Sequence, residues 1–292
     1  MKIHELKAKS IIVPSNLPDV DYVINPYTGC QFGCIYCYAT FMGRFVNEPR
    51  RNWGNYVYVK ANAVELAGNQ LRKWGAKRKE ASILFSSVTD PYQAVENKFW
   101  LTRGILGALV ESGYLGPVSI LTKSPLVSRD VDLLIRLNAE VGLTVTTTDD
   151  RLSRYLEVSA PQARRRLDTL EKLGKAGIRT YAFVGPLLPH FRYQPNLLDE
   201  LFGAIAGTGS KEVYVEHGRR FFDAYLKHKR IPNVGFEDFY PIIDEAKQDF
   251  IFKMKGLDTD NPQYNEIETF LKIRSDIFVW EWFERWFGDV EK

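Results

Sequence analysis

The sequence contains no run of about 18 apolar residues, so a membrane-spanning helix and a membrane partner are not expected. Residues 1–15 lack the apolar core and small-residue cleavage site of a secretion signal, and we therefore expect a cytoplasmic protein. The excess of one charge sign over the other is also small, because 39 basic and 36 acidic residues leave a net charge of +3. This weak bias does not by itself imply a nucleic-acid partner.

Cysteine is scarce too, but its placement is informative. The chain has only 3 cysteines, Cys30, Cys34 and Cys37, and all of them lie between positions 30 and 37. An odd number at such short spacing is a poor disulfide framework. Clustered thiols in the cytosol are more often metal ligands or catalytic groups. We therefore interpret this segment as a metal or cluster site.

The rest of the chain has the composition of a globular protein with a large core, with 45% hydrophobic residues. Apolar, β-branched runs alternate with amphipathic stretches. The strands are expected at 21–25, 82–87, 118–122, 143–147, 179–184 and 212–216. The helices are expected at 63–74, 101–112, 129–138, 161–176 and 197–206, with Gly113, Gly142 and Gly177 at helix ends.

Strands that are each followed by a helix indicate repeated βαβ units and a parallel sheet. We predict an α/β fold, a partial (β/α)6 TIM-type barrel of parallel strands with a C-terminal helical extension. A doubly wound sheet remains an alternative, since periodicity does not distinguish the two. The expected organisation is an N-terminal arm (1–20), the barrel (21–234) and the helical extension (235–292), with the chemistry at the carboxyl ends of the strands.

The cysteine segment directly follows the first expected strand. Thiolates are soft ligands that favour iron–sulfur clusters, zinc and Cu(I). Spacings of three and two intervening residues allow one short loop to wrap a cubane, and Gly29 and Gly33 permit tight turns. Three ligands for four irons leave one iron open to a small molecule. The alternative is a structural zinc site with His190 or His217 as the fourth ligand.

The CxxxCxxC spacing, with Tyr36 before the last cysteine, resembles the signature of the radical S-adenosylmethionine (SAM) superfamily. The resemblance implies a [4Fe–4S] cluster on Cys30, Cys34 and Cys37 whose open iron binds SAM. It also implies reductive cleavage of SAM to a 5′-deoxyadenosyl radical, which abstracts hydrogen from a substrate. A reductant protein such as flavodoxin or ferredoxin would supply the electron.

Further segments resemble the spore-photolyase-like (DNA repair photolyase-like) branch of that superfamily. They are NPYTGCQFGCIYCYAT at 25–40, SSVTDPYQ at 86–93, TKS at 122–124, SRD at 128–130, Glu157, Arg166 and GPLLP at 185–189. This resemblance implies a lyase or modification reaction on a nucleic-acid or nucleotide lesion. One position departs from the pattern, because spore photolyase has a hydrogen-donating cysteine where this chain has Ser87.

Polar residues that follow the expected strands are candidate SAM contacts. Ser87, Thr89 and Asp90 could hold the SAM zwitterion, although Asp90 also fits a turn. The Lys123 ammonium would attract the SAM carboxylate, and Thr146 could reach the ribose. The remaining candidates are Tyr36 and Tyr38 beside the cluster, and Val184 and Leu188 against the adenine.

Two other functions stay open on the sequence. One is a radical SAM enzyme that acts on a peptide or small metabolite in the open barrel. The other is a non-catalytic iron–sulfur or zinc binding module.

Overall fold

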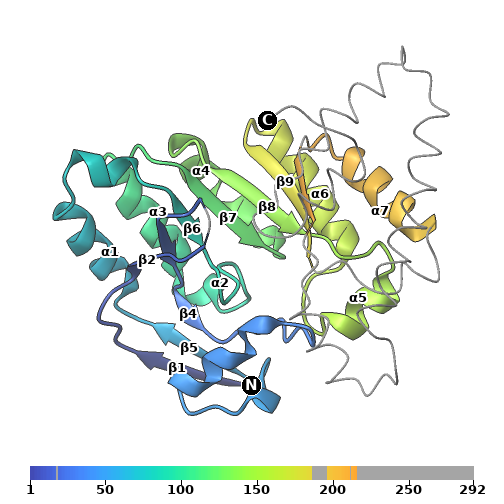
Figure 1. Ribbon diagram of the computed structural model, residues 1–292, viewed down its shortest axis with the longest axis horizontal. Coiled ribbons are helices and arrows are strands. Elements are labelled where there is room, and N and C mark those ends of the chain that lie inside the picture. The colour runs from blue at the N-terminus through green and yellow to red at the C-terminus, as the bar shows by residue number, and fades with distance from the viewer. Residues whose placement is uncertain (18, 186–195, 211, 216–292) are drawn as a thin grey trace.

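The fold consists of two sheets with helices around the larger one (Figure 1). The computed structural model describes residues 1–17, 19–185, 196–210 and 212–215. In spatial order, the seven-stranded sheet contains β10 (Glu212–Val215), β9 (Arg179–Val184), β8 (Glu140–Thr144), β7 (Val118–Thr122), β6 (Ile83–Phe85), β3 (Tyr22–Ile24) and β2 (Ile12–Pro14). The three-stranded sheet contains β1 (Lys2–Leu6), β5 (Tyr56–Lys60) and β4 (Tyr27–Thr28).

The strands from β3 to β10 in the larger sheet are all parallel, and only β2 pairs antiparallel with its neighbour. Their spatial order follows the chain order without reversal, whereas a doubly wound sheet reverses at a switch point. The predicted α/β partial barrel is therefore confirmed. The helices that lie between the strands include α1 (Ala63–Arg72), α3 (Leu101–Glu111), α4 (Val131–Arg136), α6 (Ala163–Lys175) and α7 (Asn196–Ala206).

Further short elements occupy the segments that connect these strands and helices. They are α2 (Glu96–Phe99), α5 (Asp150–Leu156) and the 3₁₀ segments η1 (Tyr38–Phe45), η2 (Arg50–Asn52), η3 (Ala76–Glu80) and η4 (Pro125–Asp130). Apolar side chains from neighbouring strands form the core beneath them, among them Ile24, Phe85, Ile120, Leu143 and Ala182, all with no exposed surface. Each of the larger side chains among them, from isoleucine, leucine and phenylalanine, contributes about 1.5–3 kcal/mol through burial.

The predicted strands 118–122 and 179–184 match β7 and β9, but the strand predicted at 143–147 begins and ends three residues earlier, at Glu140 and Thr144. Gly113 and Gly177 follow α3 and α6 with φ of 65° and 81°, which confirms them at helix ends. The same prediction for Gly142 is wrong, because Gly142 lies inside β8. A Cβ atom there would meet the Tyr181 ring of β9 at 2.1 Å, so close packing between strands requires this glycine.

Residues 1–20, for which an extended arm is expected, contain β1 and β2 and pair with β5 and β3. The boundaries of the arm, the barrel and the extension remain predictions, and residues 235–292 lie outside the described residues. Among the described helices, none has the length and apolar character needed to cross a membrane.

Candidate active site

The three cysteines lie on one loop, the cluster loop (residues 29–37), which leaves β4 and leads into η1. Gly29 and Gly33 have φ of 90° and 61°, as the expected tight turns require. At Gly29 a Cβ atom would lie 2.5 Å from the Tyr56 carbonyl oxygen, so the loop passes directly over β5. The Cys37 N–H donates to the Cys34 carbonyl at 3.1 Å, which closes the turn between these two candidate ligands.

All three thiols are free; those of Cys30 and Cys34 are buried, and that of Cys37 is half-buried. Burial raises the pKa of each thiol, and Asp90 and the other two cysteines raise that of Cys30 further. The cysteines are therefore close enough to repel one another as thiolates. A bound metal reverses this preference, because a coordinating thiol is deprotonated.

The donor set fits an iron–sulfur cluster. In the described part of the chain, no group of three or more His, Cys, Asp or Glu side chains is arranged as a site for a single metal ion. A cubane differs from one zinc ion because each thiolate binds a different iron atom, so the ligands stand further apart. His190 and His217, the candidate fourth zinc ligands, lie outside the described residues.

The loop after β6 holds the cluster loop through hydrogen bonds. The Thr89 hydroxyl donates to the Gly29 carbonyl at 2.6 Å, and the Gln93 amide donates to the same oxygen at 3.3 Å. The Gln31 N–H donates to Gln93 Oε1 at 2.8 Å, and Gln31 Oε1 accepts from the Val95 N–H at 2.6 Å. The Thr89 side chain, expected to contact SAM, thus positions the loop that carries the ligands.

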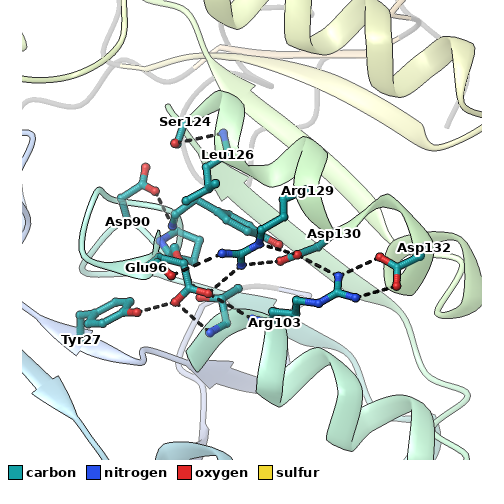
Figure 2. Close-up of polar contacts among 12 residues, drawn as sticks. Tyr27, Asp90, Glu96, Arg103, Ser124, Leu126, Arg129, Asp130 and Asp132 are labelled. Carbon is teal, nitrogen blue, oxygen red and sulfur yellow. Dashed lines mark hydrogen bonds and ion pairs between the residues drawn. The ribbon is translucent and has the colours of Figure 1, made fainter. Parts of the chain in front are cut away.

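Asp90 joins the carboxyl ends of β6 and β7. Its carboxylate accepts from the Thr122 hydroxyl at 2.6 Å, the Lys123 N–H at 2.8 Å and the Tyr92 N–H at 2.9 Å. Figure 2 shows Asp90 beside the hydrogen bonds and ion pairs of Glu96, Arg129 and Asp130. Burial raises the pKa of Asp90, although these hydrogen bonds oppose that effect. Because it accepts from the Lys123 N–H, the Asp90 carboxylate fixes the position of the Lys123 backbone.

Lys123 and Glu157 lie next to the cluster loop. The Lys123 side chain is 15% exposed, and its Nζ lies 3.8 Å from Glu157 Oε1 and 5.7 Å from the centre of the Tyr36 ring. Glu157 also accepts from the Tyr36 hydroxyl and, at 3.2 Å, from the Thr146 hydroxyl. Burial alone would raise the pKa of Glu157, but Arg166 and Lys123 more than reverse this and hold it at about 2.

Arg166 is the main counter-charge of Glu157. Its side chain has no exposed surface and forms an ion pair with Glu157. Its remaining donors bind the Pro161 carbonyl at 2.7 Å and the Thr144 carbonyl at 2.9 Å. Arg166 thereby connects Glu157 to the end of β8. Sequence reasoning includes both residues in the family pattern but assigns neither a role in the site.

A second buried carboxylate, Glu96, holds the strand that leads into the cluster loop (Figure 2). It accepts from the Tyr27 hydroxyl of β4, from the Thr102 N–H at 3.0 Å and from Arg129 NH2 at 2.9 Å. Arg129 and Arg103 in turn pair with Asp130 at 2.7 and 3.0 Å. This network was not expected from the sequence.

Two candidate residues meet where η1 approaches β6. The Tyr38 hydroxyl donates to the Ser87 carbonyl, and the Ser87 hydroxyl accepts from Asn25 Nδ2 at 3.2 Å. Next to them, Ser86 adopts a left-handed φ of 70°, and its buried hydroxyl has no hydrogen-bond partner in the described part of the chain. A strained residue with an unsatisfied buried hydroxyl is typical of a ligand site.

Two further candidates lie at or beyond the end of β9. Val184 is its last residue, and its side chain is fully buried, so a ligand at the rim of the sheet would meet only its backbone. Leu188 lies outside the described residues.

Comparisons with known proteins identify the family of this chain. Residues 24–201 match the family model of the radical SAM superfamily. An uncharacterised protein of Methanocaldococcus jannaschii is 40% identical over 190 residues, which are 65% of this chain and 69% of that protein. A radical SAM Nα-GlyT isomerase of Pseudomonas phage M6 is 29% identical over 214 residues, 70% of this chain and 42% of the isomerase.

Solved structures share the fold. Spore photoproduct lyase with bound AdoMet and dinucleoside spore photoproduct has a TM-score of 0.55 at 16% identity, over 80% of this chain and 68% of the lyase. SuiB of Streptococcus suis bound to the precursor peptide SuiA has a TM-score of 0.52 at 18% identity, over 80% of this chain and 46% of SuiB. With more than half of its length matched by the family model, the chain belongs to the radical SAM superfamily, whose enzymes use a [4Fe–4S] cluster and SAM.

Proposed function

We propose that this enzyme holds a [4Fe–4S] cluster on Cys30, Cys34 and Cys37 and acts on a nucleic acid or nucleotide by hydrogen abstraction. When bound, the cluster and SAM supply the 5′-deoxyadenosyl radical. The observation that carries the proposal is the gathering of three free thiols on one hydrogen-bonded loop beside the Lys123 ammonium.

The surrounding residues suit the binding of a zwitterionic cofactor. Lys123 would receive the SAM carboxylate in a charge-assisted hydrogen bond. The hydroxyls of Ser86 and Ser87 lie at the end of β6, where they could accept hydrogen bonds from the SAM ammonium. The hydroxyl of Thr146 and the backbone after Val184 lie at the ends of the next strands and are proposed contacts of the ribose and adenine.

The substrate class rests on the relatives. The likeness to spore photoproduct lyase with its bound dinucleoside photoproduct supports a nucleic-acid or nucleotide substrate, and the phage isomerase supports a rearrangement. This chain has no cysteine outside the three proposed ligands, and the O–H bond of Ser87 is too strong to replace a thiol as hydrogen-atom donor. We therefore propose a rearrangement or another modification, rather than a repair reaction that ends with hydrogen transfer from a cysteine of this chain.

A peptide or small metabolite is the second candidate substrate, favoured by the structural likeness to SuiB bound to its precursor peptide. In either case, a small electron-transfer protein such as flavodoxin or ferredoxin would reduce the cluster.

Anaerobic reconstitution tests the chemistry. The wild type should bind iron and sulfide and form 5′-deoxyadenosine from SAM with dithionite, and Cys34→Ala should lose both properties. Asp132→Asn, which alters an exposed ion pair, is the control and should retain both. A wild type that binds metal but never cleaves SAM would instead indicate a non-catalytic module.

Salt dependence tests the substrate class. Binding of an oligonucleotide through phosphates should weaken steeply between about 50 and 200 mM salt, because bound counterions are released. Undetectable or salt-independent binding would remove nucleic acid as the substrate and favour the peptide or metabolite alternative.

A further inference from the structure

Each side of the cluster loop is tied to the barrel by a buried tyrosine, a buried glutamate and an arginine, of which Arg166 is buried and Arg129 is half-buried. In each case the tyrosine hydroxyl donates to the carboxylate, and the arginine forms an ion pair with it. Both glutamates are almost completely buried. The Glu96 network consists of Tyr27, Glu96 and Arg129, and the Glu157 network consists of Tyr36, Glu157 and Arg166.

The two networks differ in one respect. Glu157 also lies 3.8 Å from the Lys123 ammonium. The Glu96 carboxylate instead contacts the first backbone N–H groups of α3 and the Arg129 guanidinium of η4, and it pairs with no lysine among the described residues. Lys123 in turn lies against the cluster loop, with its ammonium 5.7 Å from the centre of the Tyr36 ring. A single carboxylate therefore contacts both the cluster loop, through Tyr36, and the lysine beside the cluster.

The position of that carboxylate is fixed independently of Lys123. Arg166 holds it from one side, and the hydroxyls of Ser153 and Thr146 donate to it at 3.1 and 3.2 Å. A lysine side chain has several rotatable bonds, and its ammonium is precise only where neighbours restrict it. Here Glu157 and the face of the Tyr36 ring restrict it on the side of the cluster loop.

We propose that Glu157 is a positioning residue, which fixes the Lys123 ammonium relative to the cluster loop so that SAM binds with its carboxylate on Lys123. The inference rests on the proposed function, because it assigns Lys123 to SAM. It predicts that a change in the Glu157 network weakens SAM binding more than the matched change in the Glu96 network does.

The test compares Glu157→Gln with Glu96→Gln in the anaerobically reconstituted full chain. Both changes remove one buried carboxylate that accepts a tyrosine hydroxyl and pairs with an arginine. The readout is the change that SAM causes in the electron paramagnetic resonance spectrum of the dithionite-reduced cluster, titrated to give a Kd. We expect the Kd to rise about tenfold in Glu157→Gln and less than about twofold in Glu96→Gln, at matched iron content.

A second pair of variants, with smaller changes, tests the same role in case a glutamate variant does not fold. Tyr36→Phe and Tyr27→Phe each remove only one hydroxyl, and we expect a severalfold rise in the SAM Kd for Tyr36→Phe alone. In a Lys123→Gln background, Glu157→Gln should have no further effect on the Kd, since it acts through Lys123.

The outcomes separate the inference from the function on which it rests. Equal Kd values within each matched pair, or a full additional loss in the Lys123→Gln background, would overturn the positioning role. A wild type that assembles no cluster, or whose spectrum does not respond to SAM, would overturn the proposed function itself.

Discussion

Removal of the Arg166 guanidinium is the perturbation whose cost follows most directly from the structure. Arg166 has no exposed surface, and among the described residues it binds the Glu157 carboxylate and the carbonyls of Pro161 and Thr144. Arg166→Leu retains much of the aliphatic stem but leaves the Glu157 charge without its nearest counter-charge. Lys123, at 3.8 Å, is then its only remaining ion-pair partner among the described residues.

The expected magnitude combines these losses. Breaking a buried ion pair by removal of one partner costs about 3–5 kcal/mol, because a charge remains buried without compensation. The two carbonyls that lose a donor would each add about 1 kcal/mol, while Lys123 and the hydroxyls around Glu157 offset part of the total. We expect a loss of about 4 kcal/mol in unfolding free energy, which lowers the melting temperature by roughly 10 °C in a domain of this size.

Urea unfolding followed by far-ultraviolet circular dichroism measures this loss in the iron-free chain, where cluster binding does not contribute. The matched control is Asp132→Asn, whose carboxylate is 57% exposed and pairs with Arg103 at 2.8 Å. A pair of this kind contributes at most about 1 kcal/mol. The double change Arg166→Leu with Glu157→Gln should be less destabilised than Arg166→Leu alone, because the uncompensated charge is absent. A loss below about 1 kcal/mol for Arg166→Leu, or a double variant less stable than the single one, would refute the reasoning.

Three further outcomes are expected. Gly142→Ala should lower the free energy of unfolding by about 1–3 kcal/mol, because the added Cβ would lie 2.1 Å from the Tyr181 ring. The control is Gly107→Ala on α3, where a Cβ meets nothing within 4 Å; it should be neutral or stabilising in the same urea unfolding assay. Thr89→Val should lower the iron retained after reconstitution, since the Gly29 carbonyl loses its 2.6 Å donor, and iron content equal to that of the wild type would argue against this role. Prolonged aeration should remove iron from the wild type, whereas a stable iron content would indicate a fully ligated metal.

The parts of the site that were predictable are those encoded by local sequence. The cysteines, the turn glycines and the preceding barrel strand all lie within one short segment. Gly29 and Gly33 form the expected turns, and only the 2-residue β4 intervenes between β3 and the cluster loop. The six strands of the barrel were recognised because each is an apolar run of strand length. Gly142 was misassigned because the side chain that requires a glycine there, Tyr181, belongs to another strand and is distant in the sequence.

The two buried carboxylate networks were not predictable for the same reason. Nothing in the local sequence around Glu96 and Glu157 indicates a buried carboxylate, and each accepts a hydrogen bond from a tyrosine that lies 69 or 121 positions away. The small sheet of β1, β5 and β4 was also missed, because its pairing joins residues 1–20 to a segment after the cluster loop. Contacts across such distances arise only from the folded chain.

The polar residues at the ends of the strands all hold other parts of the site in position. Thr89, Asp90, Tyr36 and Thr146 were expected to contact SAM, yet each forms a hydrogen bond to the cluster loop, to Glu157 or to the backbone at Lys123. These bonds hold the proposed ligands and the lysine in place before any cofactor binds. A preorganised site needs less rearrangement when SAM arrives, so more of the binding free energy is available to orient it. Within this arrangement the Lys123 ammonium, which can donate three hydrogen bonds and has Glu157 only at ion-pair distance, retains the capacity to bind an anion.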